Sequence, residues 1–100
     1  MKNKYERIIK RPDGSRVKIT AAFDPGNRYG EFEYNAVVEV CAPGKRKFSE
    51  PVTETYDYRK MSLDERRLYR QQQYLTVATA DEIISVKMEL WRTLRPVPER

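Results

Sequence analysis

Apolar and polar residues alternate in short runs over the first half of the chain, which is the pattern of half-buried β-strands. The alternation is cleanest from Glu31 to Val40, where every second residue is apolar. The strands that this pattern predicts, all within residues 4–58, are 5–11, 16–23 and 31–40, with a fourth inside 47–58. Pro51 restricts the fourth strand to an edge of the sheet, because proline has no N–H to donate.

The turn at Pro12-Asp13-Gly14 decides which residues of the first two strands face each other. A loop of three residues, with Gly14 as a bulge residue at positive φ, places Ile9 opposite Val17. A loop of two residues would set Lys10 against Val17 instead. Because the register follows the buried face, we predict the three-residue loop.

The pattern changes in the second half of the chain, where apolar residues recur three or four positions apart, as on one face of a helix. The sequences S-L-D-E at Ser62 and T-A-D-E at Thr79 are capping boxes that mark helix starts. They predict two helices, 63–76 and 80–94, with a break at 76–79. One long bent helix is the alternative, because neither Gly nor Pro interrupts this stretch.

Strands followed by helices indicate an α+β fold. We predict a single domain over residues 1–100, built as an antiparallel β-meander of three or four strands. Two C-terminal helices are expected to pack on one face of this sheet. A chain of this length can fold alone but has little apolar material to spare, since 39% of its residues are hydrophobic and 35% are charged.

The composition argues against catalysis. Histidine is absent and Cys41 is the single cysteine, so the commonest general base and the commonest metal ligand are missing. Glu31 and Glu33 share a strand face, but pairing with cations across the sheet explains them better than acid–base chemistry does. We therefore predict that the protein is not an enzyme, with no catalytic residue, no cofactor and no metal site.

The chain shows no sign of export or of membrane insertion. Its N-terminal residues lack the apolar run of a signal peptide, and no stretch approaches the roughly 20 apolar residues that cross a bilayer. A lone cysteine fits a reducing compartment. We expect a cytoplasmic protein without a membrane partner. The net charge of +5 permits nucleic acid or an acidic protein as partner.

The segment 62–74 combines a helix start with an unusual number of polar residues. At 100° per residue, a coherent Arg/Gln/Tyr stripe forms on one side of the helix, while Leu68 and Leu75 point the other way. Arginines could clamp phosphates or carboxylates, and tyrosine could stack. The plainer interpretation is a solvated face whose arginines pair with neighbouring carboxylates. The candidate residues of this stripe are Arg66, Arg67, Arg70 and Tyr74.

Three consecutive cations, Lys45, Arg46 and Lys47, follow Pro43-Gly44 at an expected turn. Such a tip could lie along a phosphate backbone. It could equally keep an edge strand unpaired and soluble. The sequence does not show whether these cations and the arginine stripe converge on one surface.

The helix predicted over 80–94 has a wide apolar arc of roughly 200°, more than one sheet face requires. Lys87 lies inside the arc, where its stem can cover apolar surface. The surplus could pack on the preceding helix. Otherwise it is an interface for another protein or for a second copy in a homodimer, with anchors Ile84, Met88 and Trp91.

Two function classes follow. The first is a small non-catalytic protein that docks on a protein or nucleoprotein complex with an acidic surface. In size and style the chain is similar to accessory proteins of phages and mobile elements, such as anti-CRISPR proteins, that inhibit a nucleic-acid-processing complex by binding it. The alternative is direct binding of nucleic acid through the cationic tip and the Arg/Gln/Tyr helix face.

Overall fold

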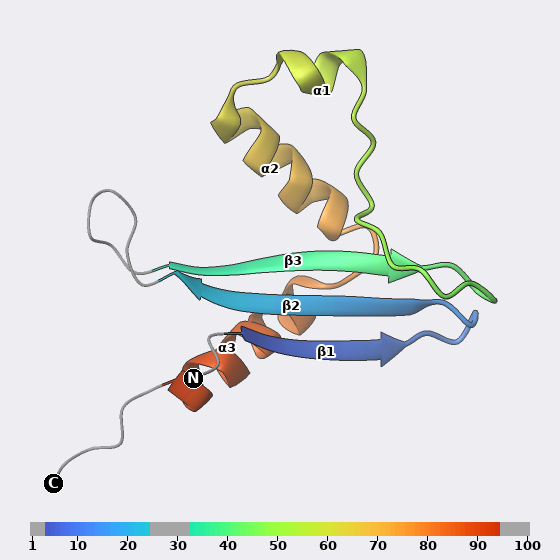
Figure 1. The fold of residues 1–100 in the computed structure, drawn as a ribbon, viewed down its shortest axis with the longest axis vertical. Helices are drawn as coiled ribbons and strands as arrows, with labels where there is room; N and C mark the ends of the chain where they lie inside the picture. The colour runs from blue at the N-terminus through green and yellow to red at the C-terminus, as the bar shows by residue number, and fades with distance from the viewer. Residues whose placement is uncertain (1–3, 25–32, 95–100) are drawn as a thin grey trace, which may run out of the picture.

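The computed structural model describes residues 4–24 and 33–94 of the chain. Within them, three antiparallel strands form one sheet in the order β1-β2-β3 (Figure 1). The strands are β1 Lys4–Lys10, β2 Arg16–Asp24 and β3 Glu33–Cys41. The prediction of an α+β fold with an antiparallel meander and C-terminal helices is confirmed.

The register of the first hairpin is the predicted one. Ile9 pairs with Val17 and Arg7 pairs with Ile19, so the loop has three residues. Gly14 takes φ 93° in this loop, a backbone conformation that residues with a Cβ rarely adopt. The choice between the two loops was therefore decided by the apolar face and by one glycine.

The inward face of β3 is also as predicted. Ala36 pairs with Ala21, Val38 with Ile19, and Val40 with Val17. Glu31 and Phe32, which the sequence placed in the same strand, lie outside the described residues.

The predicted fourth strand within 47–58 is wrong. A single antiparallel bridge joins Val40 to Ser49, and the chain then leaves the sheet edge at Pro51. The short helix α1 Tyr56–Lys60 follows, which the sequence analysis missed. The hydroxyl of Thr55 accepts a hydrogen bond from the Tyr58 N–H, so a residue type that favours strands here caps a helix.

Two longer helices follow, α2 Leu63–Tyr74 and α3 Ala80–Leu94. Both begin at the predicted capping boxes. The Ser62 hydroxyl accepts from the Glu65 N–H at 3.2 Å, and the Thr79 hydroxyl accepts from the Glu82 N–H at 3.1 Å. The chain is not helical between Leu75 and Thr79, so the alternative of one bent helix is wrong.

The two long helices meet the sheet differently (Figure 1). Helix α3 crosses one face of all three strands, and α2 contacts the sheet mainly at β3 while rising away from it with α1. The core lies between α3 and the sheet, with Tyr74 and Ala78 closing one side. No helix within the described ranges is long and apolar enough to cross a membrane. The buried core residues from the two layers are Val17, Ile19, Ala21, Val38, Val86 and Leu90.

Candidate functional site

The arginine stripe on α2 is largely occupied by contacts inside the molecule. Arg66 donates hydrogen bonds to the carbonyl oxygens of Tyr58 and Arg59, at 3.3 and 2.6 Å. Its guanidinium also lies 5.5 Å from the centre of the Tyr58 ring. Because these contacts satisfy carbonyls at the end of α1, Arg66 fastens α1 to α2.

Arg70 and Tyr74 hold the segment before α1 in the same way. Arg70 donates to the Tyr58 hydroxyl at 2.9 Å and forms an ion pair with Glu50 at 3.0 Å. The Tyr74 hydroxyl donates to the same Glu50 carboxylate. Burial and this hydrogen bond raise the pKa of Tyr74 to about 12. The hydrogen bond to Tyr58 is the main reason that the pKa of Arg70 is raised.

Three of the four candidate residues of the α2 stripe, Arg66, Arg70 and Tyr74, therefore bind groups inside the molecule, and neither interpretation made from the sequence predicted this. Its arginines do not pair with Asp64 or Glu65, and Glu65 instead accepts from the Ser62 N–H. Leu68, on the other side, is 61% exposed, and Leu75, just after α2, is 53% exposed and lines a groove together with residues of the stripe. A satisfied polar network can occupy the inner face of a helix when its partners come from another segment.

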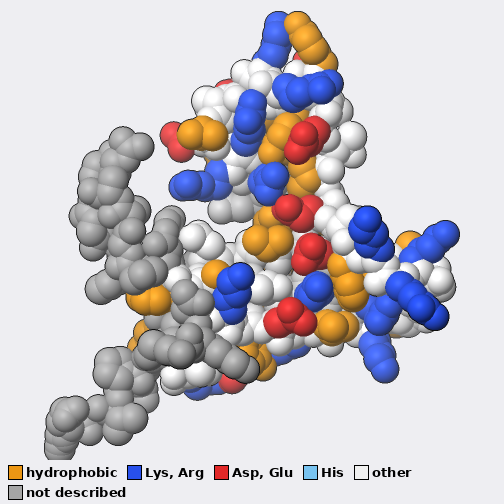
Figure 2. Space-filling view, viewed as in Figure 1, with side chains coloured by type: hydrophobic (Ala, Val, Ile, Leu, Met, Phe, Trp, Pro, Cys, Tyr) orange, Lys and Arg blue, Asp and Glu red, His pale blue; other side chains and the backbone are white. Residues whose placement is uncertain are grey.

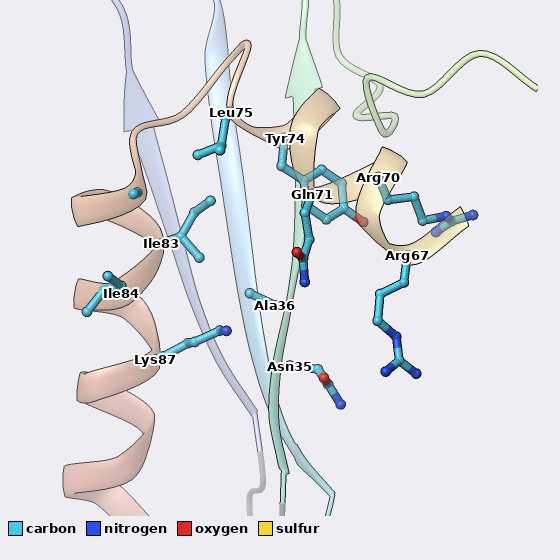
Figure 3. A pocket seen from close by; sticks show the side chains of 11 residues that line it. Asn35, Ala36, Arg67, Arg70, Gln71, Tyr74, Leu75, Ile83, Ile84 and Lys87 are labelled. Atoms are coloured by element: carbon cyan, nitrogen blue, oxygen red, sulfur yellow. The ribbon is translucent and has the colours of Figure 1, made fainter. Parts of the chain in front are cut away.

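Arg67 differs from the other stripe residues because its side chain is exposed and lines a groove between α2 and α3. The groove has a volume of about 410 Å³. Figure 3 shows Gln71 of α2 and Lys87 of α3 beside Ala36 of β3, while Arg67 extends from α2 across β3 from Lys87. The remaining lining residues are Asn35, Arg70, Tyr74, Leu75, Ala80, Ile83 and Ile84.

The two ends of the groove differ in chemistry. Arg67, Asn35 and Lys87 lie toward one end, and Leu75 and Ile83 toward the other (Figure 3). Every charged residue that the structure describes in the lining is a cation. Within the described part of the chain, neither Arg67 nor Lys87 has a hydrogen-bonding or ion-pair partner.

The groove continues onto the outer side of α3. A second hollow of about 450 Å³ is lined by Ile84, Lys87, Met88 and Trp91, and it shares Ile84 and Lys87 with the first. Ile84 is 54%, Met88 44% and Trp91 37% exposed, so α2 does not cover the apolar surplus of α3. We call this continuous surface the groove face. It comprises Asn35, Ala36, Arg67, Gln71, Leu75, Ile83, Ile84, Lys87, Met88 and Trp91.

The cationic tip lies elsewhere. Lys45, Arg46 and Lys47 are exposed at the end of the sheet, where the Lys45 carbonyl accepts hydrogen bonds from Arg16 and from the Cys41 thiol. Figure 2 shows basic side chains over the α1–α2 region and at this end of the sheet, with acidic side chains between them. On this side of the molecule the tip and the α2 arginines are thus two separate basic areas.

Sequence reasoning identified part of the groove face. It singled out Arg67, Ile84, Met88 and Trp91, and it noted Lys87 inside an apolar arc. It missed the contribution of β3, since nothing local to Asn35 or Ala36 indicates that two helices flank them.

Among residues 4–24 and 33–94, no three His, Cys, Asp or Glu side chains are grouped so that they could hold a metal ion. The Cys41 thiol is buried and donates to the Lys45 carbonyl at 3.0 Å. No family model, no curated protein and no solved structure matches the chain. The function is therefore argued from the groove face and the tip themselves.

Proposed function

We propose that this protein is a non-catalytic docking protein that binds another macromolecule through the groove face. The observation that carries the proposal is the exposure of Ile84, Met88 and Trp91 on a helix whose opposite side, at Val86 and Leu90, is fully buried. Contiguous apolar surface of this kind on a small domain is characteristic of interaction sites. Tryptophan is also among the residues that contribute most to binding energy at interfaces.

The finer role that we propose is inhibition by occupancy. A small protein that blocks a nucleic-acid-processing complex, in the manner of anti-CRISPR proteins, needs a face of high affinity and no catalytic residues. The groove face supports this role because it joins an apolar area to cations that would favour an acidic surface. A nucleic-acid-processing complex supplies such surfaces on its protein subunits.

The proposal is tested with Met88→Asp, which puts a charge in the apolar part of the groove face, beside Ile84 and Trp91. Proteins captured by the immobilised wild type are purified, and their affinity for both forms is measured by isothermal titration calorimetry. We expect the affinity to fall by more than about tenfold in the variant, since a carboxylate would be desolvated in the interface. The matched control is Leu63→Asp at the start of α2, where the side chain is 80% exposed and outside the groove face.

Two results would contradict the docking proposal. One is a purified partner that binds Met88→Asp as tightly as it binds the wild type. The other is a partner that loses affinity equally with Leu63→Asp, because that pattern would indicate a general effect of surface charge. Circular dichroism of both variants establishes that the fold is kept.

Direct binding of nucleic acid is the second candidate, favoured by the exposed cations Lys45, Arg46 and Lys47 at the end of the sheet. Labelled DNA and RNA would be titrated at about 50 and 200 mM salt with the wild type and with a Lys45→Gln/Lys47→Gln variant. Binding that weakens steeply with salt and again in the variant would favour this candidate. An Arg66→Ala/Arg70→Ala variant does not suit this experiment, because both arginines hold α1 and Glu50 in place.

A further inference from the structure

We infer that the segment of the partner that enters the groove face is acidic and amphipathic. Its carboxylates would contact Arg67 and Lys87, and its apolar side chains would cover Ile84, Met88 and Trp91. The inference rests on the proposed function and specifies the chemistry of the partner. It follows from the charges and the layout of the groove.

The charge of the groove is positive and uncompensated. Three cations line it, and of these Arg70 is neutralised by Glu50 at 3.0 Å. Among the residues that the structure describes, Arg67 and Lys87 lack a carboxylate partner and no acidic side chain lines the groove. A carboxylate of the partner would therefore be attracted to Arg67 and Lys87 without having to displace a carboxylate already paired with them.

The layout of the groove separates charge recognition from apolar contact. Gln71 lies one turn after Arg67 on α2 and offers an amide group that can hydrogen-bond a carboxylate or a peptide group (Figure 3). Ala36 on the floor has a small side chain, so a ligand group can approach β3. The apolar area continues past Ile84 to Met88 and Trp91, which gives an elongated surface that suits a polypeptide segment.

Two other occupants fit this surface less well. A second copy of the chain would bring another net charge of +5 and, in a symmetric pair, its own Arg67 and Lys87 toward the same site. Nucleic acid would place phosphates and sugars against Ile84, Met88 and Trp91, three apolar side chains that leave Lys87 as the one cation in the described lining of this hollow. The acidic segment satisfies both the cations and the apolar side chains.

Trp91 is the single tryptophan of the chain and lies on the groove face, so its fluorescence reports occupancy directly. The probes are three peptides of about 14 residues, roughly four helical turns, that have Leu at the same positions. They differ only in the polar residue at the remaining variable positions, which is Glu in the first peptide, Gln in the second and Lys in the third. We expect the Glu peptide to shift the Trp91 emission. It should bind at least about tenfold more tightly than the Lys peptide at low salt.

Variants that remove charge test whether Arg67 and Lys87 cause the preference for the Glu peptide. Arg67→Gln/Lys87→Gln should bind the Glu and Gln peptides with equal affinity. Lys45→Gln/Lys47→Gln removes the same charge at the tip and should keep the preference for Glu. A preference that survives the first variant, or that is lost equally in both, would overturn the assignment to the groove.

The peptide experiment separates this inference from the proposed function. Equal affinity for the Glu and Lys peptides, or no binding of the Glu peptide, would overturn the acidic partner. The docking proposal would still be judged by purified partners and Met88→Asp. Conversely, Glu-peptide binding that Met88→Asp leaves unchanged would support the charge recognition while contradicting the apolar half of the proposed docking surface.

Discussion

At the scale of single residues, one ion pair connects the end of β1 to the first turn of α3. Arg11, just after β1, donates to both carboxylate oxygens of Glu82 at 2.7 Å and to the Val77 carbonyl at 3.0 Å. The same carboxylate accepts from the Thr79 N–H in the capping box of α3. The hydrogen bond from Arg11 is the main reason that the pKa of Glu82 falls to about 2.

Glu82→Gln should lower the free energy of unfolding at neutral pH by about 2 kcal/mol, because it removes a charged hydrogen bond and the capping carboxylate. The folded-state pKa of Glu82 lies below its ordinary value of 4.5. Its stabilisation is therefore complete above that value and is lost as the pH falls toward 2. Urea titrations across this range should show the difference between wild type and variant shrinking.

The control for this substitution is Glu89→Gln, which removes a carboxylate paired with the exposed Arg92 on α3. Exposed pairs of this kind contribute little, so this variant should change stability by less than about 0.5 kcal/mol at any pH. A Glu82→Gln effect that is constant from neutral pH to pH 2 would contradict the role given to the ion pair.

At the scale of elements, α3 has two apolar sides with different tasks. Val86 and Leu90 are fully buried against the sheet, whereas Ile84, Met88 and Trp91 face the solvent. In helix α2 the buried side carries Tyr74, whereas the aliphatic residue Leu68 is exposed. The buried side of each helix packs in the fold, and the outer side of α3 keeps apolar surface exposed at Ile84 and Met88.

Leu90→Ala should lower the free energy of unfolding by about 3 kcal/mol, because it leaves a cavity in the core. Met88→Ala, two residues away on the same helix, should change it by less than about 0.5 kcal/mol. Denaturant titrations of both variants check this contrast. Comparable losses would mean that Met88 packs inside the fold and is not available to a partner.

At the scale of the whole molecule, the cations of the two candidate surfaces lie in two separate places. The tip 45–47 lies at the end of the sheet, and Arg67 and Lys87 lie in the groove between the two long helices (Figures 1 and 3). Two separate areas allow the charge of each to be removed without disturbing the other. This separation is what makes the matched variants above informative.

The isolated protein should be a monomer, with a mass of 11.9 kDa in sedimentation equilibrium at low and high protein concentration. The reason is the like charge that two groove faces would bring together. A reversible dimer that Met88→Asp abolishes would contradict this expectation. It would assign the groove face to a second copy, which is the homodimer considered from the sequence.

The sequence by itself determined the features that depend on neighbouring residues. The Gly14 turn fixed the register of the first hairpin, and the capping boxes at Ser62 and Thr79 fixed two helix starts. Each of these involves groups within a few residues of one another, so local pattern and intrinsic conformational preference were sufficient. The alternation in β3 succeeded for a related reason, since one buried face specifies the register. The same reasoning failed at 47–58, because Thr55 suits a strand and a helix cap alike.

Only the tertiary structure decided which surfaces are covered. Arg70 is held by Glu50, twenty positions away, and no periodicity indicates that this partner is present. The groove likewise combines Asn35, Arg67 and Lys87 from three distant segments. A helical pattern shows that two stripes exist, but burial depends on what the rest of the chain brings against each one. The candidate site could be predicted in part, through residues on α3, and its charged end became visible only when β3, α2 and α3 were placed together.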